Sequence, residues 1–350
     1  MKKSRHFPEL LIQLETVTDL NLALEKLQHD DVVGIPTETV YGLGAAINSE
    51  KALKKIFAIK ERPFFDPLIV HVSSKQMAQK LTPSWSPMLD FLSEHFWPGP
   101  LTLVVPKTEM VSSLITSGLE TVGIRMPRNS LTLTLIERLG VPIAAPSANK
   151  FGRTSPTTAA HVQSEFKNEN ILVLDDGPCE VGLESTVLKV DRIGQDYVLA
   201  ILRAGQIKKT DLEKALRSRP FQYQFVEAVS QKDSPGHLKH HYMPQIPLVL
   251  VKNRAYTSQK ILDKTRQMLH QLPDEIEGVK IRKPLHIQTT KEFVLPDQST
   301  LAARSLYSEL RKMAEEPVDF LFFRILDYHS REEWQAVMDR LTKAASLVLD

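Results

Sequence analysis

The sequence contains a single cysteine, Cys179, so no disulfide bond can form within the chain. A protein without disulfides is typical of a reducing compartment. No apolar run approaches the length of a membrane-spanning helix. Pro8, Glu9 and Gln13 interrupt the stretch from Met1 to Leu14, which argues against a signal peptide. These absences predict a cytoplasmic protein with no membrane partner.

The chain also lacks a strong excess of charge of either sign. It has 44 Lys and Arg against 42 Asp and Glu, a net charge of +2. This balance does not predict nucleic-acid binding over the whole surface, so any basic site would be a local patch. The 350 residues suffice for two domains, and a hydrophobic content of 42% is ordinary for a soluble globular protein.

The stretch Gly34–Gly44 reads Gly-Ile-Pro-Thr-Glu-Thr-Val-Tyr-Gly-Leu-Gly and directly follows an apolar strand. It allows two interpretations: a tight connection from a strand to a helix, or a loop that holds a ligand. Lys60 and Arg62 favour the second, because glycines, hydroxyls and cations together suit a phosphate-bearing ligand. Both cations stand in a turn that Pro63 predicts at the end of a helix capped by Ser49, so we expect them to be exposed.

Three further polar positions have two interpretations each. Strand alternation places Arg125 with Thr121 on one face of a strand, which suits either a ligand wall or a solvated face. His71 lies in a short apolar strand, where it is either a core residue or a ligand contact. Ser147 and Asn149 favour a turn, and they also suit a ligand contact beside small residues.

Strands and helices alternate along the chain, which predicts an α/β protein. We predict one domain at 15–218, a linker rich in Pro and Gly at 219–247, and a second domain at 248–350. The second domain should hold a small parallel sheet with helices on both faces. The linker contains His237, His240 and His241, but their spacing matches no standard metal site, so we predict no metal there.

Taken in order, these motifs resemble the threonylcarbamoyl-AMP synthases in their long form, which has an extra C-terminal domain. The resemblance is carried by Pro36–Gly44, Lys60-x-Arg62-Pro63, Trp97–Thr102, Arg125–Pro127, Ala145–Asn149, Glu184–Thr186, Ser234–Gly236 and His241–Pro244. It implies a YrdC-like catalytic domain, a twisted mixed sheet with flanking helices around a cavity. It also implies a smaller C-terminal Rossmann-like domain with three α/β layers, and a linker that acts as a lid over the cavity.

The resemblance implies synthesis of L-threonylcarbamoyladenylate and pyrophosphate from L-threonine, bicarbonate and ATP. ATP would be a substrate, with Mg²⁺ accompanying it. The product would pass to a tRNA threonylcarbamoyl transferase complex, which modifies the adenosine next to the anticodon of tRNA.

The resemblance also assigns roles to single residues. Its catalytic signature falls on Lys60, Arg62, Ser147 and Asn149. Its ATP contacts fall on Lys60, Arg62, Asp66, Thr121, Ser147, Ser155, Arg203 and Tyr242, and its L-threonine contacts on Thr39, His71, Arg125, Ala145 and Ser185. Asp66 stands where the family usually has Asn, which adds a negative charge near phosphate.

Two other functions remain open. The chain could be an RNA-binding module with a basic concave surface and no catalysis, which salt-sensitive RNA binding without ATP consumption would indicate. It could also carry out carbamoyl transfer like the hydrogenase-maturation enzymes, which contain a related domain. The single Cys179 and the lack of zinc-finger spacing argue against that architecture.

Overall fold

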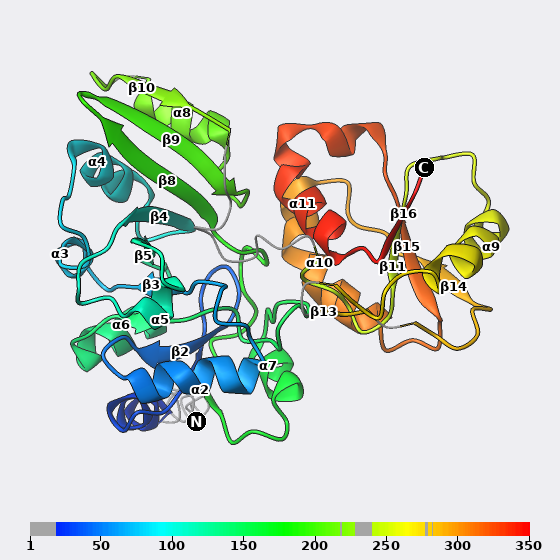
Figure 1. Cartoon of the computed structure of the whole chain (residues 1–350), viewed down its shortest axis with the longest axis horizontal. Helices are drawn as coiled ribbons and strands as arrows, with labels where there is room; N and C mark the ends of the chain where they lie inside the picture. The colour runs from blue at the N-terminus through cyan, green and yellow to red at the C-terminus, as the bar shows by residue number, and fades with distance from the viewer. Residues whose placement is uncertain (1–18, 218, 228–239, 277–278, 282) are drawn as a thin grey trace, which may run out of the picture.

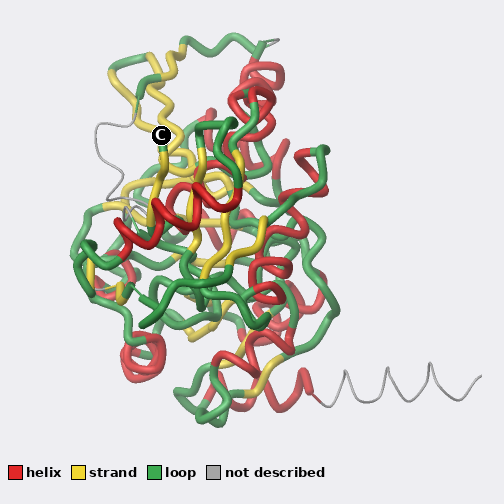
Figure 2. The backbone as a smooth tube through the Cα atoms, turned by 90° about the vertical axis from the view of Figure 1, so that its right-hand side faces the viewer, coloured by secondary structure: helices red, strands yellow, loops and turns green. Residues whose placement is uncertain are grey.

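The computed structural model describes residues 19–217, 219–227, 240–276, 279–281 and 283–350. This part of the chain forms two α/β domains, the N-terminal one on the left of Figure 1 and the C-terminal one on the right. Figure 2 views the protein from the side of the C-terminal domain. No helix among the described residues is both long and apolar enough to cross a membrane.

The N-terminal domain is built on a ten-stranded mixed sheet. In spatial order its strands are β10 (Tyr223–Phe225), β9 (Asp196–Arg203), β8 (Thr186–Ile193), β4 (Leu101–Pro106), β5 (Thr121–Arg125), β3 (Ile69–His71), β6 (Ile143–Ala144), β2 (Gly42–Ala46), β1 (Val33–Ile35) and β7 (Leu172–Val173). Strands β3 and β5 pair in parallel, whereas β4 and β5 pair antiparallel. The mixed sheet expected from the resemblance is therefore confirmed.

Helices surround this sheet. They are the helix 19–28 and the labelled helices α2 (Glu50–Lys60), α3 (Lys75–Gln79), α4 (Pro87–Phe96), α5 (Ser113–Thr116), α6 (Ser130–Leu139), α7 (Ala159–Glu165) and α8 (Lys209–Leu216). The predicted cap of α2 is confirmed, because the Ser49 side chain accepts a hydrogen bond from the backbone N–H of Ala52. The helix ends at Lys60, as Pro63 predicts.

Strand alternation determines which side chains reach the face of the sheet that lies away from the main core. Val70 of β3 and Ile124 of β5 pack into that core, so the next residue of each strand points to the opposite face. These residues are His71 and Arg125, which lie side by side because β3 and β5 pair in parallel register. Arg125 is buried, so the interpretation of a solvated face is wrong.

The first glycine-rich stretch is not a connection from a strand to a helix, because β1 and β2 pair antiparallel around it. Neither Gly42 nor Gly44 has a positive φ. A Cβ atom on Gly44 would lie 2.8 Å from Ile143 Cγ2. At Gly44 the glycine therefore permits close strand packing, and the loop before it is free to face a ligand.

The C-terminal domain contains a four-stranded parallel sheet of β14 (Thr290–Glu292), β15 (Phe320–Arg324), β11 (Leu248–Val251) and β16 (Leu347–Leu349). Helix α9 (Ser258–Leu269) packs on one face of it. Helices α10 (Ser299–Met313) and α11 (Gln335–Ala344) pack on the other. A short pair of strands, β12 (Glu275–Ile276) and β13 (Val279–Lys280), lies outside this sheet. The expected arrangement in three layers is confirmed.

The two domains share one apolar cluster at their junction. Val40 and Leu183 of the N-terminal domain pack with Leu306 of α10 and Leu341 of α11. Within the expected linker, residues 223–225 form β10 at the edge of the N-terminal sheet. Residues 228–239, which include His237, lie outside the described residues. Residues 240–247, here called the strap, are described and lead into β11.

Candidate active site

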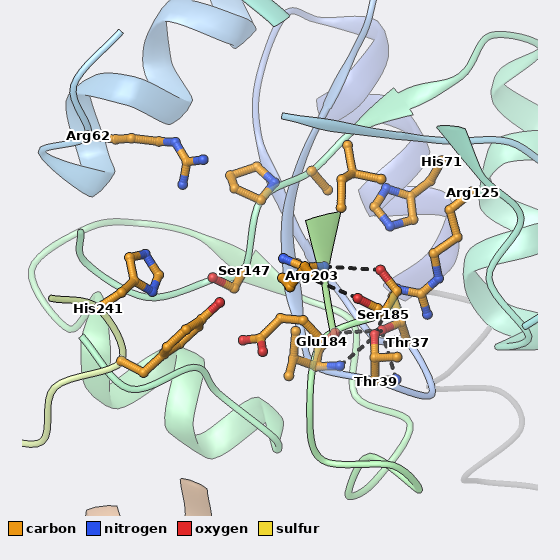
Figure 3. Close-up of a pocket in the computed structure, with 16 residues that line it drawn as sticks. Thr37, Thr39, Arg62, His71, Arg125, Ser147, Glu184, Ser185, Arg203 and His241 are labelled. Atoms are coloured by element: carbon orange, nitrogen blue, oxygen red, sulfur yellow. Dashed lines mark hydrogen bonds between the residues drawn. The ribbon is translucent and has the colours of Figure 1, made fainter. Parts of the chain in front are cut away.

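A pocket lies on the face of the ten-stranded sheet that carries His71 and Arg125, and the strap contributes to its lining. It contains about 550 Å³ of space, including the part open to solvent. Arg62 and His241 lie at one end of it, and His71 and Arg125 lie at the other (Figure 3). The pocket thus has two chemically different polar ends.

The loop between β1 and β2 is shaped by the hydroxyl of Thr37. This hydroxyl donates to the carbonyl oxygen of Val40 at 2.6 Å and accepts from the backbone N–H groups of Thr39 and Val40, each at 3.2 Å. It also lies 2.8 Å from the Thr39 hydroxyl. The Thr39 hydroxyl in turn accepts a hydrogen bond from Arg125 Nη1 at 2.8 Å. The loop thus presents the Thr39 hydroxyl at the Arg125 end of the pocket.

The guanidinium group of Arg125 is fixed by several polar contacts. Its Nε donates to the carbonyl oxygen of Gly99 at 3.2 Å, and its Nη2 lies 2.8 Å from Glu38 Oε2. Nη2 makes no hydrogen bond with acceptable geometry to the described residues. Burial and the neighbouring charge of Arg125 lower the pKa of His71 to about 3, so its imidazole is neutral at neutral pH. This end therefore combines a fixed cation with a neutral imidazole.

Lys60 corrects the expectation of an exposed turn, because only 1% of it is accessible. Its Nζ donates to the backbone carbonyls of Ser147, at 2.6 Å, and Asn149. Burial and the charge of Arg62 lower the pKa of Lys60 well below its usual range. Lys60 thus fixes the loop that carries Ser147 and does not line the pocket.

Arg62 is also buried, but it does line the pocket. Its Nε donates to the carbonyl oxygen of Asp66 at 3.1 Å, and its Nη2 donates to that of Pro67 at 2.9 Å. The Asp66 carboxylate lies 2.8 Å from Nη2. The negative charge that distinguishes this chain from the family pattern is therefore paired with the arginine of the same turn.

The loop before β8 contributes Glu184 and Ser185. Arg203 donates from Nε to the Ser185 carbonyl and from Nη2 to its hydroxyl, each at 3.1 Å. The Ser185 hydroxyl also lies 2.7 Å from that of Thr102. Glu184 accepts a hydrogen bond from Ser155 at 2.6 Å. Arg203 and Ser185 are thereby fixed as a pair in the pocket wall.

The strap contributes His241 and Tyr242, both buried. Tyr242 has a φ of 65°, in the left-handed region that bulky residues rarely adopt. Its carbonyl accepts from the Thr154 hydroxyl at 3.2 Å, and the His241 N–H donates to the Lys343 carbonyl at 2.9 Å. Contacts to both domains thus hold the strap on the pocket.

Most of the predicted site residues line this pocket: Thr39, Arg62, His71, Arg125, Ala145, Ser147, Ser185, Arg203 and Tyr242. Five do not: Lys60, Asp66, Thr121, Asn149 and Ser155. Asn149 instead donates to the carbonyls of Lys150 and Arg153, at 2.8 and 2.9 Å. Thr121 lines a different cavity, with Pro67 and Thr102.

Glu184, His241 and Thr37 line the pocket although the site predictions did not include them. All three stand within or beside motifs that carry the family resemblance, so proximity in the sequence was an available signal. Among the described residues, no three His, Cys, Asp or Glu side chains come together as a possible metal site.

Comparisons with known proteins address both domains. Residues 25–205 match the family described as telomere recombination (Sua5, YciO and YrdC), and residues 207–346 match threonylcarbamoyl-AMP synthase, C-terminal domain. The threonylcarbamoyl-AMP synthase of Bacillus subtilis is 35% identical over 99% of this chain and 98% of its own length. That of Pyrococcus abyssi is 34% identical over 93% and 94%.

The chain belongs to the threonylcarbamoyl-AMP synthase family. The crystal structure of Pyrococcus abyssi Sua5 complexed with L-threonine superposes with a TM-score of 0.76 and 32% identity, covering 95% of this chain and 96% of that one. The similarity to these threonylcarbamoyl-AMP synthases therefore spans both domains. Membership favours the synthase over the RNA-binding module, since the relatives carry the name of an enzyme along their whole length.

Proposed function

We propose that this pocket forms L-threonylcarbamoyladenylate and pyrophosphate from L-threonine, bicarbonate and ATP. The observation that carries the proposal is the separation of its two ends, with His71 and Arg125 at one and Arg62 at the other. One end suits an amino acid and the other suits phosphates. The Pyrococcus abyssi relative solved with L-threonine supports an amino-acid ligand in the same fold.

We assign L-threonine to the end formed by Thr39, His71, Arg125, Ala145 and Ser185. Arg125 Nη2 forms an ion pair with Glu38 at 2.8 Å that lacks hydrogen-bond geometry, and we propose that the guanidinium also donates to the threonine carboxylate. Neutral His71 can accept or donate a hydrogen bond without adding charge beside that carboxylate. The buried setting strengthens each of these contacts.

ATP is assigned to the other end, formed by Arg62, Ser147, Arg203 and Tyr242. The two guanidinium groups would offset negative charge on the phosphates and on departing pyrophosphate. Lys60 acts through the backbone, because it holds the loop that carries Ser147. Asn149 and Ser155 likewise support the neighbouring loops.

The reaction then needs two bond-forming steps. The threonine amine attacks the carbon of bicarbonate, whose C–O bond breaks with loss of water, or the carbon of carbon dioxide formed from it, with loss of a proton, and gives a carbamate. A carbamate oxygen attacks the α-phosphorus of ATP, the bond to the β-phosphate oxygen breaks, and pyrophosphate leaves. Such a transfer depends mainly on positioning and charge stabilisation, which fits a wall of fixed cations without an activated nucleophile.

The pocket does not fit a dedicated protein site for Mg²⁺. Among the described residues that line the pocket, the one carboxylate is that of Glu184, which already accepts hydrogen bonds from Ser155 and Tyr307 and forms an ion pair with Arg340. Magnesium binds few protein carboxylates and commonly accompanies nucleotide phosphates. We therefore propose that it enters on ATP. We further propose cytoplasmic synthesis and delivery of the adenylate to a tRNA threonylcarbamoyl transferase complex.

The proposal is tested by following pyrophosphate release while each substrate is omitted in turn. We expect release only when ATP, L-threonine and bicarbonate are all present. An Arg125→Met variant should raise the KM for threonine much more than that for ATP. Release of orthophosphate, or release that does not depend on threonine, contradicts the proposal.

A further inference from the structure

The C-terminal domain contributes one buried cation to the edge of the pocket. Arg340 of α11 is fully buried, and its Nε lies 2.8 Å from Oε2 of Glu184. Its Nη1 donates to Asp339 at 2.6 Å. Its guanidinium carbon lies 5.2 Å from the centre of the Tyr242 ring. One side chain therefore touches the pocket wall, the strap and its own domain.

The partners of Glu184 come mainly from the C-terminal domain. The Tyr307 hydroxyl of α10 donates to its carboxylate at 2.9 Å, and Arg340 supplies the charge-assisted bond. Among the described residues of the N-terminal domain, Ser155 donates a hydrogen bond to it. Burial alone would raise the pKa of Glu184, but the charges of Arg340 and Arg203 outweigh burial and lower it to about 2. The carboxylate is ionised in the wall of a pocket assigned to phosphates.

The same cation holds the strap. The Tyr242 ring contacts the Arg340 guanidinium on the C-terminal side and stacks on the Tyr307 ring, with centroids 5.8 Å apart and planes 26° apart. A cation over an aromatic ring is attracted to its face. Tyr242 keeps a left-handed backbone that needs support from its surroundings. Arg340 and Tyr307 supply that support.

We infer that Arg340 is a positioning residue of the accessory domain, which neutralises Glu184 and holds Tyr242 so that the pocket accepts the phosphates of ATP. The inference rests on the proposed function of this pocket. Without Arg340, the Glu184 carboxylate would lose its ion-pair partner while it faces a polyanionic ligand, and the Tyr242 ring would lose its contact with the guanidinium. The C-terminal domain thereby acts on the nucleotide end.

The test replaces Arg340 with Met, which keeps an unbranched apolar stem but removes the guanidinium and its charge. We expect the KM for ATP to rise about tenfold or more, with a smaller change in kcat and in the KM for threonine. The matched control is Arg254→Met in the same domain, which breaks an exposed pair with Asp327. The control should leave the KM for ATP unchanged.

A second substitution separates charge compensation from packing. The double variant Glu184→Gln with Arg340→Met removes both charges of this ion pair together, so the KM for ATP should fall well below that of Arg340→Met alone. Arg340→Lys keeps the charge and should lie between the wild type and Arg340→Met. A double variant as impaired as Arg340→Met, or equal KM values for the Lys and Met variants, overturns the inference.

Folding of each variant is checked by its thermal midpoint. If Arg340→Met does not fold, Tyr307→Phe replaces it, because this change removes a donor to Glu184 and keeps the ring that stacks on Tyr242. A raised KM for ATP in Tyr307→Phe supports the inference, and an unchanged KM overturns it. If the proposed function itself is wrong, the wild type fails to release pyrophosphate, so the two failures are distinguishable.

Discussion

At the residue scale, the cations of the Lys-x-Arg motif have two different roles. Arg62 lines the pocket, whereas Lys60 donates to two backbone carbonyls and acts through the loop that carries Ser147. This buried ammonium is costly to remove, because the Asn149 carbonyl then loses its donor, whereas the Ser147 carbonyl keeps a hydrogen bond from the backbone N–H of Asn149. The motif therefore combines a ligand contact with a support for the loop.

Lys60→Met should lower both turnover and stability. The Asn149 carbonyl loses its Lys60 donor, which costs about 1–3 kcal/mol, so we expect the free energy of unfolding to fall by about that amount. We also expect pyrophosphate release to slow by about 100-fold, as a small misplacement of site residues can do. Lys54→Met on the same helix is the control, since Lys54 is exposed and forms an exposed ion pair with Glu50. Wild-type turnover in Lys60→Met would contradict this role.

Asp66→Asn tests the departure from the family pattern. The carboxylate lies 2.8 Å from Arg62, so its removal leaves a buried cation without its charged partner. We expect the free energy of unfolding to fall by about 1–3 kcal/mol, because the ion pair is lost while the polar amide keeps the shape of the carboxylate. The freed charge of Arg62 should leave ATP binding unchanged or tighter. Calorimetric titration measures the affinity of the variant for ATP. Clearly weaker binding would show that the Asp66 carboxylate helps to bind the nucleotide.

At the element scale, the loop before β8 touches helix α10 of the other domain. Gly182 has a φ of 78°, and a Cβ atom there would lie 2.5 Å from the carbonyl oxygen of Arg304. No side chain fits between these two backbones. The glycine therefore sets how closely α10 approaches Glu184 and the pocket.

Gly182→Ala should loosen this contact. We expect it to lower the free energy of unfolding by about 2–4 kcal/mol, from backbone strain and steric overlap together, and to raise the KM for ATP. Gly177→Ala is the matched control, because Gly177 has a φ of 75° but a Cβ there meets nothing within 4 Å. In the control, backbone strain alone should lower the free energy of unfolding by about 1–2 kcal/mol, and the KM for ATP should not change. Equal effects of the two substitutions on KM would contradict the account.

The sequence predicted many elements of the fold and failed in identifiable places. Helix α2 followed from its cap and its proline stop, and the pairing of His71 with Arg125 is consistent with strand alternation. The hairpin of β1 and β2 was missed, because glycines that permit close strand packing look like glycines of a turn. The burial of Lys60 was missed because its partners are backbone carbonyls 87 and 89 residues away.

At the scale of the whole molecule, the junction of the domains joins the core and the site. Val40 and Leu183 belong to the cluster that includes α10 and α11, and Glu184 lies next to them in the chain. The apolar and charged contacts between the domains are therefore made by adjacent residues. The spacing of residues within each domain could not predict these contacts, because they depend on how the two domains dock.

A chain ending at residue 227 should test the junction. It keeps β10 but loses the strap, Tyr307 and Arg340. It also exposes Val40 and Leu183, whose burial contributes about 1.5–3 kcal/mol each. We expect a folded but less soluble domain with weaker ATP binding and slower synthesis, measured by calorimetry and by pyrophosphate release. Wild-type ATP affinity in this shortened chain would contradict a role of the second domain in the site.

The most direct measurement identifies the product of the full chain by mass. The reaction contains ATP, isotopically labelled bicarbonate and labelled L-threonine, and pyrophosphate is counted in the same sample. The account predicts one product that carries AMP, the bicarbonate carbon and threonine, formed in equal amount with pyrophosphate. A product that lacks the bicarbonate carbon, or consumption of ATP to ADP, would contradict it.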